Sequence, residues 1–246
     1  MDTMIRHAEK PDAQAIHDVA QRVSAKKYIL DYLDGQGREI SHLTDMSVND
    51  IKARLPELIT EDQINFLNRR LAASGFILYP LAVDDPDQPN YAERIKLSNH
   101  FWLANNDDVV KSFMMAYTLE KMEKIRQKTG NDTSVLDYFL TKANRIRDGI
   151  DMPNFEKGIY VQQVATMPSV SRTVTTSMVQ KAALPENVGD APFMLGEIAQ
   201  EPDKNRASTL LFLSLGGKMV ATRPKDNGQR TSGTFMKLFP SPEDSL

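Results

Sequence analysis

The chain has 246 residues, a formal net charge of -3 and no cysteine. A chain of this length buries a substantial core, so we expect one large domain or two to three small ones and not a disordered polymer. The lack of cysteine excludes disulfides, thiolate metal sites and cysteine nucleophiles, and the acidic balance argues against a protein whose whole surface coats nucleic acid.

Membrane and secretion signals are missing from the sequence. No apolar run approaches the roughly 18 residues that cross a bilayer, and the N-terminus MDTMIRHAEKPDAQ lacks the apolar centre of a signal peptide. We therefore expect a cytoplasmic protein, or one enclosed in a virion, with no membrane partner.

Helical periodicity dominates the N-terminal region, residues 1–98. Apolar residues recur at helical spacing over residues 13–33, which predicts one or two amphipathic helices. A short helix is predicted at SVNDIKARL, where Ser47 or Asn49 is a suitable cap and Pro56 is expected to end the helix.

The third predicted helix begins at Thr60 and ends near Gly75. The run FILYPLAV that follows is typical of a strand, and YAERIKLS is predicted to return as a second strand. Three helices and a hairpin occur in this order in a winged helix-turn-helix. Such a domain would present four side chains of the third helix to a DNA groove: Asn65, Asn68, Arg69 and Arg70. The acidic loop DDPDQPN would repel phosphates, so a packing or protein-interaction role is favoured over DNA reading.

Residues 99–150 are predicted to form a long helical hairpin. Apolar residues keep a helical period over residues 106–128 and again over residues 133–149. The short sequence TGND lies between them, which predicts two antiparallel helices.

Residues 151–246 are predicted to be rich in strands and irregular. GIYVQQVATM and SRTVTTSMV are rich in Val and Thr, as strands are. The segment TLLFLSLGGKMVAT favours a hairpin around its two glycines, with a helix over residues 205–215 as the alternative. The final FPSPEDSL is predicted to be a solvated tail.

The sequence offers no catalytic or metal-binding motif. The histidines lie far apart and in no ligand spacing: His7, His17, His42 and His100. The patterns GxGxxG, GxxxxGKS and GxSxG are missing, so neither a nucleotide cradle nor a nucleophile elbow is supported. We therefore predict a protein that is not an enzyme and has no metal or cofactor.

Positive charge is gathered late in the chain. Residues 111–147 hold eight basic and four acidic side chains, and residues 203–237 hold seven basic and two acidic ones. The loop TRPKDNGQRTSGT combines basic, small and polar residues, which suit contact with a phosphate backbone. The predicted nucleic-acid contacts are Arg223, Lys225 and Arg230 of this loop, with Arg145, Arg147, Arg69 and Arg70 from the helices.

These patterns predict an α+β fold, with a mainly helical N-terminal two thirds in winged-helix order and a β-rich, irregular C-terminal third. The predicted function is that of a structural or interaction protein. It would self-associate or assemble with protein partners, as a viral coat or nucleoprotein-like subunit does, and contact RNA or DNA through its basic segments. The alternative is a winged-helix transcriptional regulator that binds duplex DNA.

Overall fold

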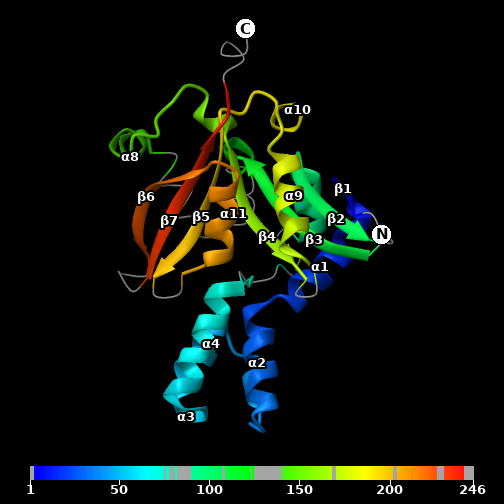
Figure 1. Cartoon of the computed structure of the whole chain (residues 1–246), viewed down its shortest axis with the longest axis vertical. Coiled ribbons are helices and arrows are strands. Elements are labelled where there is room, and N and C mark those ends of the chain that lie inside the picture. Colours follow the sequence, from blue (N-terminus) through cyan, green and yellow to red (C-terminus); the bar gives the residue numbers. More distant parts are fainter. Residues whose placement is uncertain are drawn as a thin grey trace.

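The computed structural model describes residues 3–74, 76–77, 81, 90–106, 109–122, 124, 139, 141–167, 170–201, 204–225 and 230–240. Seven strands of this part of the chain form one mixed sheet, in the order β1-β2-β3-β4-β5-β7-β6, with helices on both faces (Figure 1). The strands are β1 (Met4–His7), β2 (His100–Asn106), β3 (Val109–Thr118), β4 (Ile159–Thr166), β5 (Phe193–Glu201), β6 (Lys218–Lys225) and β7 (Arg230–Leu238).

The described part of the chain contains α-helices of four to fourteen residues. The α-helices are α1 (Ala13–Arg22), α2 (Ala25–Gly35), α3 (Val48–Leu58), α4 (Glu61–Ser74), α5 (Tyr91–Leu97), α8 (Lys142–Arg147), α9 (Arg172–Ala182), α10 (Pro185–Val188) and α11 (Arg206–Ser214). Short 3-10 turns occur at Lys10–Asp12, Ser41–Leu43 and Phe155–Lys157. None of the described helices is long and apolar enough to span a bilayer.

The predicted fold class is wrong, because the sheet begins at residue 4 and runs through the middle of the chain. The largest error concerns residues 106–128, where Val109–Thr118 of the predicted helix form strand β3 and only residues 119–122 and 124 of the described part are helical. Six consecutive residues of β3, Ser112–Tyr117, are buried, since helices cover both faces of this strand. A strand that is buried on both sides loses its alternating pattern and resembles a helix in sequence.

Three further predictions fail at positions where a helix cap decides the structure. YAERIKLS was predicted to be a strand but forms α5, whose N-cap side chain, Asn90, accepts a hydrogen bond from the Glu93 amide. SRTVTTSMV forms α9 in the same way, with Ser171 as its cap. The predicted hairpin at TLLFLSLGG is wrong and its helical alternative is right, since α11 is followed by Gly216 at a φ of 77°.

The helices α1, α2, α3 and α4 and the strand β4 confirm their predictions. Ser47 caps α3, as expected, but the helix continues past Pro56 to Leu58. Most of the predicted strand at residues 76–83 and the last six residues of the tail lie outside the described residues. Of the predicted helix at 133–149, the part Lys142–Arg147 forms α8, while residues 133–138 and 140 lie outside the described residues.

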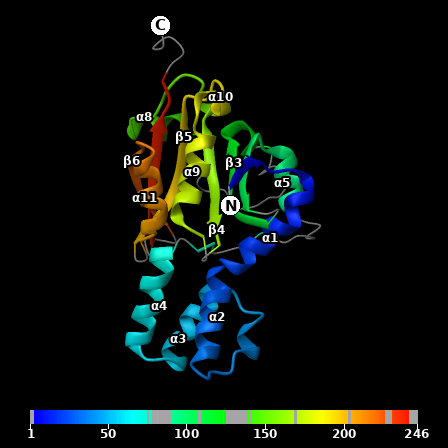
Figure 2. The same cartoon turned by 45° about the vertical axis from the view of Figure 1, so that its right-hand side comes forward.

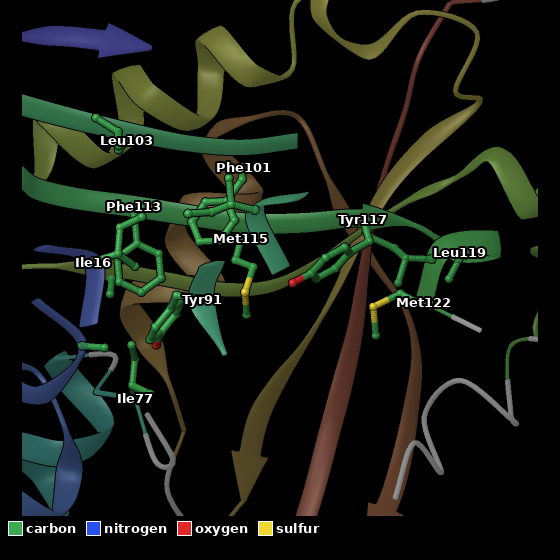
Figure 3. Packing of buried hydrophobic residues seen from close by; sticks show 14 of the residues in the cluster. Ile16, Ile77, Tyr91, Phe101, Leu103, Phe113, Met115, Tyr117, Leu119 and Met122 are labelled. Carbon is green, nitrogen blue, oxygen red and sulfur yellow. The ribbon is translucent and has the colours of Figure 1, made fainter. Parts of the chain in front are cut away.

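Two apolar layers hold the sheet between its helices. On one face, α1 and α5 cover an aromatic cluster in which the Tyr91 ring packs edge-on against Phe113, with centroids 5.7 Å apart (Figure 3). On the other face, α9 and α11 pack on a second cluster that includes Trp102, Met194 and Phe212. We call these the α1/α5 face and the α9/α11 face.

Helices α2, α3 and α4 form a separate helical lobe with its own apolar core, which includes Ile29, Ile51 and Leu67. The lobe lies beyond the ends toward which β4 and β5 point (Figures 1 and 2). A narrow neck joins it to the sheet domain, where the Ala25 amide donates to the Ile77 carbonyl over 2.9 Å and the Ile77 amide to the Val23 carbonyl over 3.0 Å. The end of α4 also contacts α11, so the lobe is anchored at two places.

Candidate functional site at the fork between β4 and β5

The two parallel strands in the middle of the sheet, β4 and β5, pair over two residues and then separate. Ile159 lies opposite Met194 and Tyr160 opposite Leu195, and no further pairs follow between these two fully described strands. Figure 1 shows the strands diverging from this point. We call the space between residues 161–166 of β4 and 196–201 of β5 the fork, closed at Tyr160 and open toward the helical lobe.

A bulge in β4 accounts for the divergence. Met115 of β3 lies opposite Gln163, and the next residue, Ala116, lies opposite Val161, so Gln162 is an extra residue in β4. An extra residue bends a strand and increases its twist, which turns β4 away from β5. Helix α5 fixes the bulge from the α1/α5 face.

Two side chains of α5 reach the bulge. The buried Arg94 donates from Nη1 to Oε1 of Gln162 over 3.0 Å. The Tyr91 hydroxyl donates to Oε1 of Gln163 over 3.3 Å. Burial raises the pKa of Tyr91 to about 12, so this hydroxyl keeps its proton at ordinary pH.

Exposure along the strands shows that solvent reaches the fork. β4 is the central strand of the sheet, where both faces are normally covered, yet Tyr160, Gln163 and Val164 are partly exposed and Gln162 is exposed. Across the fork the Glu197 side chain is only 5% exposed although the residue as a whole is partly exposed, so its accessible part is backbone. Unpaired backbone edges therefore face the crevice.

The closed end of the fork depends on a glycine. A Cβ at Gly196 would lie 2.9 Å from the Phe212 ring and 3.5 Å from the Val161 carbonyl oxygen. Phe212 thus packs directly on the β5 backbone from the α9/α11 face. The close approach needs a residue without a side chain at position 196.

A buried ion pair borders the fork on the α1/α5 face. Glu197 Oε1 lies 3.1 Å from Arg223 Nη1, and both side chains are less than a tenth exposed. Arg223 also donates from Nη2 to the Thr234 hydroxyl over 2.9 Å, and its guanidinium stacks 4.2 Å from the centre of the Phe139 ring. These contacts fix the Glu197 carboxylate beside the closed end.

Tyr160 occupies the last paired position of β4, beside this ion pair. Burial raises the pKa of Tyr160 well above its usual value, and the negative charge of Glu197 raises it further, while Arg223 opposes both. The Tyr160 hydroxyl has no hydrogen-bond partner among the described residues. Its side chain thus presents a protonated, partly accessible donor at the closed end.

The N-terminus of α9 lies at the open end of the fork, because only five residues separate it from the end of β4. A chain of hydroxyls fixes α9 to the sheet: Ser112 Oγ lies 2.7 Å from Thr166 Oγ1, which in turn contacts Thr175 Oγ1. The first amides of a helix carry partial positive charge, so α9 favours an anion at this end. The exposed Arg172 adds a full charge there.

The predicted nucleic-acid residues are dispersed over the structure. Arg223 is buried in the ion pair, Arg145 binds Asp151 and the Phe139 carbonyl, and Arg147 lies beside Asp148. Arg69 and Arg70 are exposed on α4 of the lobe, and the side chains of Lys225 and Arg230 lie outside the described residues. Nucleic-acid contact and self-association stay predictions.

Sequence reasoning missed Tyr160, Gln162 and Glu197. The one local signal was the pair of glutamines inside the apolar strand GIYVQQVAT, which marks a place where a central strand meets solvent. The fork itself is a product of strand pairing between segments that lie more than thirty residues apart, as the pairing of Ile159 with Met194 shows.

No protein-family model and no curated protein matches the chain. Solved structures do resemble it. They include a Drosophila melanogaster polyamine N-acetyltransferase (12% identity, 97% of this chain and 100% of that one, TM-score 0.49) and a Staphylococcus aureus N-acetyltransferase (12%, 97% and 99%, 0.47). The PaiA N-acetyltransferase of Thermoplasma acidophilum, in complex with coenzyme A, is 10% identical over 97% of this chain and 100% of that one, with a TM-score of 0.45.

The functional predictions need correction at this point. The winged-helix regulator is wrong, because YAERIKLS, the expected second strand of its hairpin, is helix α5. The predictions of a non-enzymatic assembly subunit and of a viral coat or nucleoprotein are corrected as well, because the solved structures that the chain resembles are N-acetyltransferases. Their basis was the lack of linear motifs. A site built from separate strands leaves no such motif in the sequence.

Proposed function

We propose that the protein is an acyltransferase whose acyl donor is a coenzyme A thioester bound in the fork. The observation that carries this proposal is the divergence of β4 and β5, which leaves a crevice with a free strand edge on one side and a helix N-terminus at its open end. This arrangement suits a long ligand that is extended, rich in amides and anionic at one end.

The free edge of β4 suits the amide-bearing arm of the donor. Residues 161–166 of β4 span about 20 Å at the rise of an extended chain. An extended ligand that carries amide groups can bind such an edge as an added strand does, through main-chain hydrogen bonds. The Tyr160 end of this edge is closed, so the thioester would lie deepest.

The N-terminus of α9 suits the phosphates of the donor. Its first turn follows the end of β4 after five residues, and Ser171 caps it by accepting a hydrogen bond from the Thr173 amide over 3.3 Å. Phosphates at the open end and a thioester at the closed end give the ligand one orientation. A nucleophile that attacks the thioester carbonyl would take the acyl group and release the thiol.

The experiment that tests this function compares two capping serines. Coenzyme A is titrated calorimetrically into the wild type and into Ser171→Asp and Ser171→Asn. Both variants keep a capping side chain, but only aspartate places a negative charge beside the expected phosphates. At an exposed site such repulsion is worth about 1 kcal/mol, so Ser171→Asp should weaken binding about fivefold while Ser171→Asn binds as the wild type does.

Ser47 supplies the matched control, because it is the capping serine of α3 in the helical lobe, where its side chain accepts a hydrogen bond from the Asp50 amide. Ser47→Asp should leave coenzyme A binding unchanged. Wild-type protein that does not bind coenzyme A, or equal losses in the Ser47 and Ser171 variants, would contradict the proposed site.

A further inference from the structure

The hydroxyl of Tyr160 differs from those of Tyr91 and Tyr117, two buried tyrosines of the α1/α5 face. Tyr91 uses its hydroxyl to hold Gln163. Tyr117, which lies directly opposite Tyr160 on β3, is fully buried, and the Arg94 guanidinium lies 6.0 Å from the centre of its ring (Figure 3). Tyr160 alone of these three combines partial exposure with a hydroxyl that has no partner in the described chain.

The protonation of Tyr160 limits its chemistry. Burial and the neighbouring Glu197 carboxylate both disfavour the phenolate. A group held so firmly in its protonated form is a poor proton donor to a thiolate, which is a weaker base than the phenolate left behind. It is well suited to donate a hydrogen bond to an oxygen on which negative charge develops.

The position of Tyr160 at the closed end of the fork indicates that this oxygen is the carbonyl oxygen of the bound thioester. The fork closes at the Tyr160–Leu195 pair, so an acyl group at the deep end of the crevice ends beside this side chain. The ion pair of Glu197 with Arg223 lies on the same face and stays fixed by Thr234 and Phe139. The surroundings of the hydroxyl are therefore preorganised, which is what stabilisation of a transition state requires.

We propose that the Tyr160 hydroxyl is a catalytic residue that donates a hydrogen bond to the carbonyl oxygen of the bound thioester as it becomes an oxyanion. This role rests on the proposed acyltransferase function. When the nucleophile attacks, the carbonyl π electrons move to oxygen, and Tyr160 stabilises that charge without giving up its proton. The carbonyl then re-forms as the carbon–sulfur bond breaks and the electron pair leaves with the thiolate, which becomes the thiol by taking up, through solvent, the proton that the nucleophile loses.

The test uses coenzyme A carrying a ¹³C-carbonyl acetyl group, bound to the full-length wild type, Tyr160→Phe and Tyr117→Phe. A hydrogen bond to the thioester oxygen weakens its C=O bond, so the infrared stretch of the bound carbonyl should lie at lower wavenumber in the wild type than in water-free solvent. Tyr160→Phe should lose this shift and bind coenzyme A as tightly as the wild type. Tyr117→Phe removes a fully buried hydroxyl one strand away and should keep the shift.

The rate of thiol release gives a second readout. Loss of one oxyanion donor typically lowers kcat about 100-fold or more. The same loss should be seen with acetyl thioesters of acidic aryl thiols, because the oxyanion forms whatever the leaving group. A loss confined to coenzyme A thioesters would instead mean that Tyr160 protonates the thiolate, and would overturn the proposal.

The two proposals fail in different ways. If coenzyme A does not bind, the proposed function fails, and this inference with it. If coenzyme A binds but the carbonyl stretch is the same in the wild type and Tyr160→Phe, the donor site stands and the role of Tyr160 is refuted.

Discussion

The helical lobe and the sheet domain differ in whether they bury polar and charged side chains. The described core of the lobe, residues 25–71, holds apolar side chains and no buried polar or charged one. The sheet domain buries Arg94, His100 and Arg223 among its strands and helices. Burying such groups opposes folding unless each is paired, so a chain that keeps them near a crevice sacrifices stability for a fixed arrangement of charge.

The largest expected effect comes from breaking the buried ion pair. Arg223→Met removes the cation that lies 3.1 Å from the buried Glu197 carboxylate, and should lower the free energy of unfolding by roughly 3–5 kcal/mol. Urea unfolding at neutral pH measures it. The double variant Glu197→Gln/Arg223→Met removes both charges and should recover most of the loss. A single variant within 1 kcal/mol of the wild type would show that the pair is not tightly held.

The same contrast explains what sequence reasoning could and could not reach. The lobe helices were predicted because each has a local apolar stripe and a recognisable cap, such as Ser47. β3 was missed because its burial on both faces depends on α1 and α9, which come from distant parts of the chain.

The fork lies still further from local sequence. It requires an extra residue at Gln162, a glycine at 196 and a parallel pair that ends after Tyr160. Each feature has meaning only once the strand order is known. The glutamine pair was visible in the sequence, but nothing local distinguished it from a solvated strand face.

The buried His100 of the sheet domain should also make the free energy of unfolding depend on pH. Burial lowers the pKa of His100 in β2 to about 4, and the nearby His7 and Lys121 add to this. Between pH 6.5 and about 4 the unfolded chain binds a proton at His100 that the folded chain does not. The free energy of unfolding therefore decreases as the pH is lowered from 6.5 to about 4, and His100 accounts for about 3 kcal/mol of this decrease.

His100→Asn is the variant that checks it. Urea unfolding at pH 7 and at pH 4 should show a smaller acid loss in the variant than in the wild type, whatever the offset at pH 7. If the free energy of unfolding changed equally with pH in the two proteins, His100 would take up its proton in the folded chain as readily as in the unfolded chain, and the prediction would be wrong.

The smallest expected effect, and the most direct comparison, exchanges one glycine in each region for alanine. Gly196→Ala puts a methyl group 2.9 Å from the Phe212 ring, and the strain of moving that ring should lower the free energy of unfolding by about 1–3 kcal/mol. Gly35→Ala, at the end of α2 in the lobe, has open space around the new methyl group and should raise it by about 0.5–1 kcal/mol. Because the Phe212 ring rests on the closed end of the fork, only Gly196→Ala should also weaken coenzyme A binding. Equal binding by the two variants would place the acyl donor elsewhere than beside Gly196.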